Sequence, residues 1–192
     1  GIKHYNYSKE YIIWSVEKSL KDLHTPYLDL LLLHRPSPLM HPNEIAAAVS
    51  VLKESGKILD FGVSNFSPSQ LSLLDNKTAV SVNQIEFSLT QHSAMHNGVL
   101  DQLLQKEILP MSWSPLGSFF KEATKTNARI KKVLDTFTKK YNATEDQLLL
   151  AWILKHPSGV IPVVGTTSKV RLQNAVKALD IELDLEDWFT LL

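Results

Sequence analysis

Five apolar runs of this chain each end in a residue whose side chain can hydrogen-bond, titrate or stack. Leu30–Leu33 stops abruptly at His34, whose neutral ring can donate one hydrogen bond. The other run ends carry Ser64, Asn65, Gln84, Trp113, Ser114, Gly165, Thr166 and Thr167. Because the carboxyl ends of parallel strands open at one edge, we expect these groups to share a pocket. Taken alone, His34 is better read as a core histidine with satisfied hydrogen bonds that anchors a strand end.

Phosphate binding is the second chemistry that the residue types allow. Gly165–Thr167 precede a helix expected to begin near Ser168, and free N–H groups together with the helix dipole favour an anion there. Lys169 and Arg171 add positive charge, and an arginine can hold phosphate through two hydrogen bonds. An ordinary capped helix with solvated charges is the alternative reading of this stretch.

The elements that must position these groups alternate between strand and helix. We expect strands at 27–33, 58–66, 79–87, 108–116 and 159–167. Helices are expected after Ser8, over 41–57, after a capping box at Ser67–Gln70, over 96–107, from 128 to 156 with a break near Tyr141, and over 168–180 and 183–192. Residues 117–127 are expected to form a loop. A capping box is also expected at Thr144–Gln147.

This alternation predicts an α/β fold with a parallel sheet covered on both faces. A doubly wound sheet and a (β/α)8 barrel both fit, but the sheet reading expects a glycine-rich fingerprint, and the chain has only seven glycines. We therefore predict a partial TIM (β/α)8 barrel with about five of the eight βα units. Five strands leave two unpaired edges, so a chain limited to these residues is expected to self-associate.

Composition narrows the class of protein further. The chain of 192 residues is long enough for one domain, is 44% apolar, and balances 20 basic against 20 acidic residues. We expect no nucleic-acid partner and no membrane partner. The chain has no cysteine, which excludes disulfides and thiolate metal sites, and no metal site is expected from its histidines. No signal peptide is expected at the start of the sequence, and a cytoplasmic location is the default.

Five motifs, in this order and spacing, resemble the aldo-keto reductase superfamily. They are YLDLLLLHRP, GKILDFGVSNFS, VNQIEFS, MSWSPLG and IPVVGTTSKVRLQNA. The stretch HRPSPLMHPNEIA resembles a bacterial oxidoreductase branch. The resemblance implies the C-terminal part of a barrel that reduces aldehydes or ketones with a nicotinamide cofactor, usually NADPH.

The resemblance also assigns roles to individual residues. His34 would orient the substrate carbonyl, and Ser64, Asn65 and Gln84 would hold the nicotinamide carboxamide. Trp113 would stack on the nicotinamide ring, and Ser114, Leu116 and Ser118 would follow the pyrophosphate. Gly165, Thr166, Thr167, Lys169 and Arg171 would bind the 2′-phosphate of NADP. Asn174 and Ala175 stand where the family often has Glu-Asn near the adenine.

The family's aspartate, tyrosine and lysine are expected to lie outside this chain. Tyr5 and Tyr7 are poor substitutes, because we place them away from the strand ends. This chain alone is therefore expected to be inactive, although the intact protein is read as an enzyme acting on a small carbonyl substrate. Two alternatives stay open: a cofactor-binding regulatory barrel without turnover, as in potassium-channel beta subunits, and an inactive fragment with an interaction role.

Overall fold

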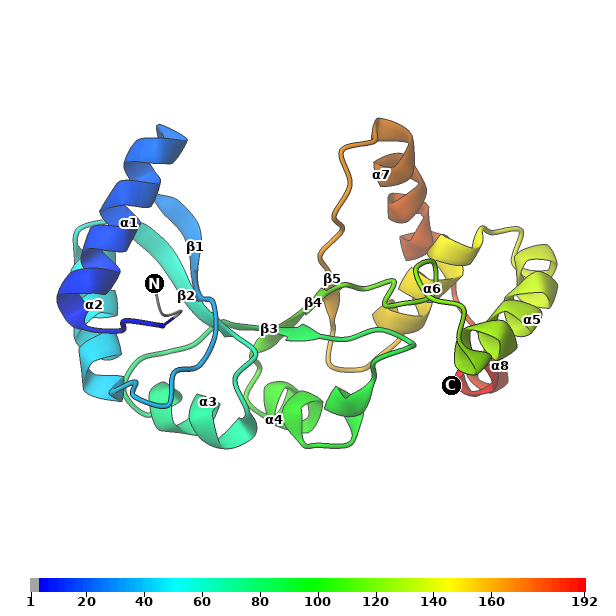
Figure 1. Cartoon of the computed structure of the whole chain (residues 1–192), viewed down its shortest axis with the longest axis horizontal. Helices are drawn as coiled ribbons and strands as arrows, with labels where there is room; N and C mark the ends of the chain where they lie inside the picture. Colours follow the sequence, from blue (N-terminus) through cyan, green and yellow to red (C-terminus); the bar gives the residue numbers. More distant parts are fainter. Residues whose placement is uncertain (1–3) are drawn as a thin grey trace. The chain divides into compact units, whose positions relative to one another are not determined.

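The computed structural model describes residues 4–192 and divides the chain into two compact units, Gly1–Gln84 and Ile85–Leu192 (Figure 1). Its five strands follow chain order in the sheet, β1-β2-β3-β4-β5, and β3 (Val82–Glu86) crosses the boundary between the units. The expected single domain stays a prediction.

The first unit begins with α1 (Lys9–Leu23), followed by β1 (Leu28–Leu33), α2 (Pro42–Glu54), β2 (Ile58–Ser64) and α3 (Pro68–Asp75). Strand β1 pairs in parallel with β2, and β2 pairs in parallel with β3. The predicted N-cap is confirmed, since the Ser8 side chain accepts from Tyr11 N. The capping box at Ser67–Gln70 is confirmed as well. The spacing of polar residues in the sequence therefore predicted the starts of these two helices correctly.

Burial of β1 differs from the expectation. The sheet is expected to be covered on both faces, but in the run Leu30–Leu33 only Leu33 is buried and the three residues before it are half-buried. The physical reason is that β1 stands at the end of the strand order and pairs with β2 alone among the described strands. Strand β2, with neighbours on both sides, buries Ile58, Phe61 and Val63 almost completely. Leu23, the last residue of α1, is 64% exposed.

Gly62 allows β1, β2 and β3 to approach one another closely. A Cβ at this position would lie 2.7 Å from a methyl group of Leu32 and 2.7 Å from the carbonyl oxygen of Val82. Because real Cβ atoms do not approach other atoms so closely, only glycine fits here without a shift of its neighbours.

The second unit contains a 3-10 turn η1 (Ser93–Met95), α4 (Val99–Gln105), β4 (Leu109–Trp113), α5 (Lys125–Lys140), α6 (Glu145–Leu154), β5 (Ile161–Pro162), α7 (Lys169–Val176), η2 (Lys177–Asp180) and α8 (Leu185–Leu191). Most predicted boundaries differ from the observed ones by a few residues, and two of the differences have a clear physical cause. Helix α5 starts at Lys125, inside the expected loop, because Thr124 caps it by accepting from Asn127 N. Strand β5 has only two residues, since Pro162 has no N–H to donate and pairing with β4 ends at Ser112.

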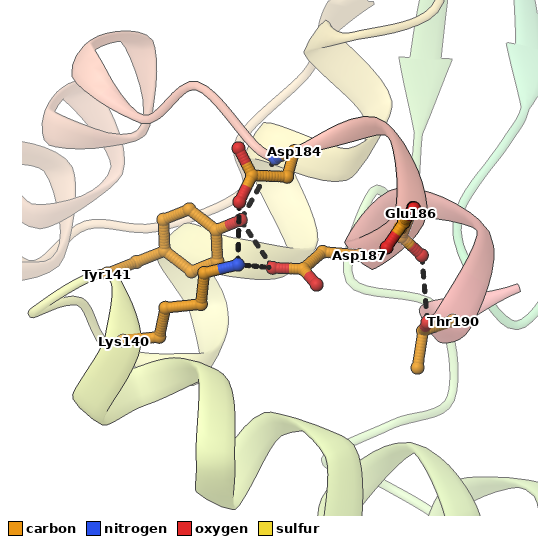
Figure 2. A network of polar contacts seen from close by, with 6 residues as sticks. All are labelled: Lys140, Tyr141, Asp184, Glu186, Asp187 and Thr190. Carbon is orange, nitrogen blue, oxygen red and sulfur yellow. Dashed lines mark hydrogen bonds and ion pairs between the residues drawn. The ribbon is translucent and has the colours of Figure 1, made fainter.

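Asp187 and Trp188 both help to fasten α8 to the rest of the second unit. The rings of Trp152 in α6 and Trp188 in α8 stack with centroids 4.9 Å apart, and each indole N–H donates to the backbone carbonyl of the other residue. Lys140 and Tyr141, at the end of α5, hold the carboxylate of Asp187, and Lys140 also holds Asp184 (Figure 2). Lys140 and Tyr141 lower the pKa of Asp187 through these hydrogen bonds. The network therefore favours the ionised carboxylate.

Candidate functional site

His34 follows β1 directly, as predicted, and its side chain is exposed. Exposure at a strand end is what a substrate-facing ring requires, and it disagrees with the alternative of a buried anchoring histidine. The catalytic role itself stays a prediction.

Tyr7 lies closer to this strand end than we expected. Its hydroxyl donates to the Arg35 carbonyl and accepts from Arg35 N at 3.4 Å, so it contacts the residue after His34. Its placement away from the strand ends was therefore wrong. Burial raises the pKa of Tyr7, and its proton is already donated to the backbone. Both facts make Tyr7 a poor proton donor.

The predicted trio of Ser64, Asn65 and Gln84 comes together in the first unit. The Gln84 carbonyl accepts from Ser64 Oγ at 2.9 Å and from Asn65 N at 2.8 Å, and Asn65 Nδ2 donates to Ser64 Oγ at 2.9 Å. Asn65 has a φ of +60°, a backbone conformation that asparagine tolerates better than most residues. Within residues 4–192 the side-chain amide of Gln84 has no hydrogen-bond partner, so it can both donate and accept toward a ligand.

Asn83 supports this trio, and the sequence reading missed it. Its side chain is fully buried and holds both backbone groups of Phe66: Nδ2 donates to Phe66 O at 3.0 Å, and Oδ1 accepts from Phe66 N at 3.4 Å. It therefore fixes the chain just after Asn65. The available signal was an asparagine in the middle of an expected strand, where a buried amide requires hydrogen-bond partners.

The second unit has a groove of two adjoining cavities, of about 530 and 660 Å³. Both cavities are lined by Gly165, Thr166 and Arg171, and the smaller one is also lined by Thr167. The larger cavity reaches Ser114 and Leu116 after β4. The groove thus brings together six residues that the sequence reading selected.

Four other selected residues of the second unit do not line either cavity: Trp113, Ser118, Lys169 and Asn174. Trp113 ends β4 and is half-buried. The backbone of Ser118 holds its own loop, since its N–H donates to Thr90 Oγ1 and its carbonyl accepts from Asn127 Nδ2. The Asn174 carbonyl accepts from Gln147 Nε2 at 3.1 Å. Their predicted contacts with a cofactor stay predictions.

Two glycines shape the groove in opposite ways. Gly117 has a φ of +55°, and a Cβ there would overlap the side-chain oxygens of Ser88 and Thr90. Its missing side chain lets the loop after β4 pack onto these hydroxyls. A Cβ at Gly165 would meet nothing within 4 Å, so glycine keeps space open there instead of allowing close packing.

The charged groups of the groove are mostly cationic. Arg171 and Lys121 line the larger cavity, and neither side chain forms an ion pair or a hydrogen bond with any of residues 4–192. The Thr166 hydroxyl accepts from Ser168 N at 3.1 Å, and Ser168 Oγ accepts from Arg171 N at 3.4 Å. These bonds hold the loop before α7 and leave the guanidinium available to an anion. Asp146 is the one acid among the lining residues of this cavity.

Across residues 4–192, no three metal-ligating side chains come together, and no helix is long and apolar enough to cross a membrane. The exposed and half-buried histidines His96 and His92 lie next to each other, with ring centroids 5.6 Å apart. Burial and the neighbouring His96 lower the pKa of His92.

The chain is similar in sequence and in fold to proteins that are already known. The model of the aldo/keto reductase family matches residues 1–191. The chain is 41% identical to the uncharacterized oxidoreductase YcsN of Bacillus subtilis over 97% of its length, and 39% identical to a 6-dehydroglucose reductase of Agrobacterium fabrum over 99%. It covers 64% of each of these relatives. A solved thermostable aldo-keto reductase bound to the inhibitor epalrestat superimposes with a TM-score of 0.88 at 26% identity, over 96% of this chain and 66% of that one.

Proposed function

Because the chain belongs to the aldo/keto reductase family, we propose that it supplies the cofactor groove and the carbonyl-binding histidine of an NADP-dependent oxidoreductase. The proposed reaction is reduction of an aldehyde or a ketone by hydride transfer. The proposal places the family's aspartate, tyrosine and lysine outside these 192 residues. A small-molecule substrate and a cytoplasmic location are parts of the same proposal.

The observation that carries the proposal is the unpaired guanidinium of Arg171 beside the open backbone of Gly165 and Thr166. A cation, a hydroxyl and accessible N–H groups at a helix start match the oxygens of a phosphate monoester. Lys121, on the opposite loop, adds a second cation for the remaining phosphates. The donor set therefore fits a phosphorylated dinucleotide.

The bound cofactor would supply the hydride. The residues of this chain would bind the cofactor, orient the substrate carbonyl and polarise it. Arg171 and Thr166 hold the 2′-phosphate end. The amide groups of Asn65 and Gln84 are suited to the carboxamide end, since an amide matches a carboxamide donor to acceptor. The His34 ring would donate to the carbonyl oxygen, which gains negative charge in the transition state, so this bond would be stronger there than in the ground state.

The test of catalysis is His34→Ala in the intact protein, which supplies the residues that this chain is expected to lack. We expect kcat for carbonyl reduction to fall roughly 10²- to 10³-fold, the scale of one lost oxyanion donor, with NADPH affinity nearly unchanged. The substrates to assay first are 6-dehydroglucose and methylglyoxal, which relatives of this chain are named for reducing. Normal turnover together with a lowered melting temperature would instead identify His34 as a structural residue.

The test of cofactor choice is Arg171→Ala. Since the guanidinium is proposed to bind the 2′-phosphate, we expect NADPH affinity to fall by about 1.5–3 kcal/mol, the loss of one charged hydrogen bond, while NADH affinity barely changes. Isothermal titration with both cofactors measures this difference. An equal loss for both would show that Arg171 does not read the 2′-phosphate. Tight NADPH binding without turnover of any carbonyl would favour the regulatory alternative.

A further inference from the structure

Two helices present matching pairs of residues to the larger cavity. Asp146 and Leu150 are one turn apart on α6, and Arg171 and Ala175 are one turn apart on α7; all four line the cavity. Residues four apart share one face of a helix. Each helix therefore forms one wall of the cavity, with a charged residue one turn before an apolar residue. The charge is negative on the α6 wall and positive on the α7 wall.

Asp146 is held in place but not neutralised. Thr144 Oγ1 donates to Asp146 Oδ1, which leaves Oδ2 without a hydrogen-bond partner anywhere in residues 4–192. No ion pair within 4 Å joins Asp146 to Arg171 or Lys121, although all three line the same cavity. The carboxylate and the cations are therefore kept apart, with space for a ligand between them.

The helix carrying Asp146 is tied to the helix carrying Arg171. Gln147, which is 5% exposed, accepts from Thr144 N at 2.9 Å and donates to the Asn174 carbonyl at 3.1 Å. This side chain joins the start of α6 to α7, so the spacing of the two walls is built into the fold.

A ligand that fits these walls has an anionic group, a flat apolar body and a donor at its edge. Phosphate near Asp146 would be repelled, so the carboxylate must face the donor part. Resting on the proposed function, we propose that Asp146 reads the base of the dinucleotide by accepting from the exocyclic amine of adenine. The base lies between the apolar residues Leu150 and Ala175, and the 2′-phosphate meets Arg171.

A purely structural role for Asp146 predicts something different. An acid in the first turn stabilises a helix through its dipole, and Glu145 beside it does the same. Glu145 pairs with Lys131 on α5 at 2.7 Å and does not line the cavity. Glu145→Gln is therefore the matched control, because it removes a charge from the same helix end on another face.

The experiment measures affinity for NADPH and for its deamino analogue, in which hypoxanthine replaces adenine and a ring carbonyl replaces the amine. Isothermal titration calorimetry on the purified protein is the assay. The unsubstituted protein should prefer NADPH by roughly tenfold to a hundredfold, the scale of a hydrogen bond to a charged acceptor. Asp146→Ala should bring the two affinities within about threefold of each other, and Glu145→Gln should leave the preference unchanged.

Asp146→Asn gives a result that misfolding cannot imitate. Thr144 continues to donate to Oδ1, so the new amide nitrogen takes the place of Oδ2 and presents donors to the groove. This variant should prefer the deamino analogue, which offers a carbonyl. Equal losses of both affinities in Asp146→Ala, or an unchanged preference in Asp146→Asn, would overturn this inference and leave the proposed function intact. Failure of the unsubstituted protein to bind NADPH would overturn both.

Discussion

Asn83→Ala tests whether one buried amide holds the strand ends of the first unit in place. The substitution removes two hydrogen bonds to Phe66 at a site with no solvent exposure. Both backbone groups of Phe66 are then left in a dry environment. An orphaned buried group costs about 1–3 kcal/mol, and the longer bond, at 3.4 Å, is the weaker of the two. We therefore expect the free energy of unfolding to fall by about 2–4 kcal/mol.

Urea unfolding followed by circular dichroism measures this loss. Ser81→Ala is the matched control, because Ser81 also donates from its side chain to a backbone carbonyl, that of Phe61 at 3.0 Å, from a half-buried position. It loses one hydrogen bond, worth about 1 kcal/mol, and orphans no N–H group. A loss in Asn83→Ala no larger than in Ser81→Ala would refute the argument.

Two other perturbations follow from the second unit. Gly117→Ala should lower the free energy of unfolding by at least about 1–2 kcal/mol, from the positive φ alone, and should weaken NADPH binding. Gly165→Ala should leave stability unchanged, because a Cβ there meets no other atom. Equal melting temperatures for the two variants would contradict the packing argument. Asp187 has a lowered pKa in the folded protein, so its stabilising contribution is present above about pH 4 and is lost as the pH falls through its folded pKa. Asp187→Asn should be less stable at neutral pH and less acid-sensitive below pH 4; parallel stability-versus-pH curves for the variant and the unsubstituted protein would show that the network in Figure 2 does not stabilise α8.

Features set by neighbouring residues could be predicted from the sequence. The capping boxes at Ser67–Gln70 and Thr144–Gln147 need only a spacing of three, and both formed. The alternation of strands and helices could likewise be predicted from the local spacing of apolar residues. Two boundaries failed for different reasons. The local cap at Thr124, which starts α5 at Lys125, was overlooked although it needs only a spacing of three. Strand β5 ends where its pairing with β4 ends, and no pattern within 159–167 carries that information.

The candidate site could be predicted only in part, for the same reason. The position of His34 directly after a strand was predicted correctly from the apolar run before it, whereas its role stays a prediction. Asp146 and Lys121 were missed because they lie on a helix start and a loop that reach the groove only through tertiary packing. Tyr7 was misplaced because nothing near it in the sequence signals a contact 28 residues away.

The stacked pair of Trp152 and Trp188 makes the docking of α8 observable by proton exchange. Each indole N–H is donated to the backbone of the other residue, so neither is free to exchange with solvent while the pair is intact. Opening of α8 breaks both bonds at once. The two indole signals should therefore share one exchange rate, which reports the local unfolding free energy of α8 rather than that of the whole chain.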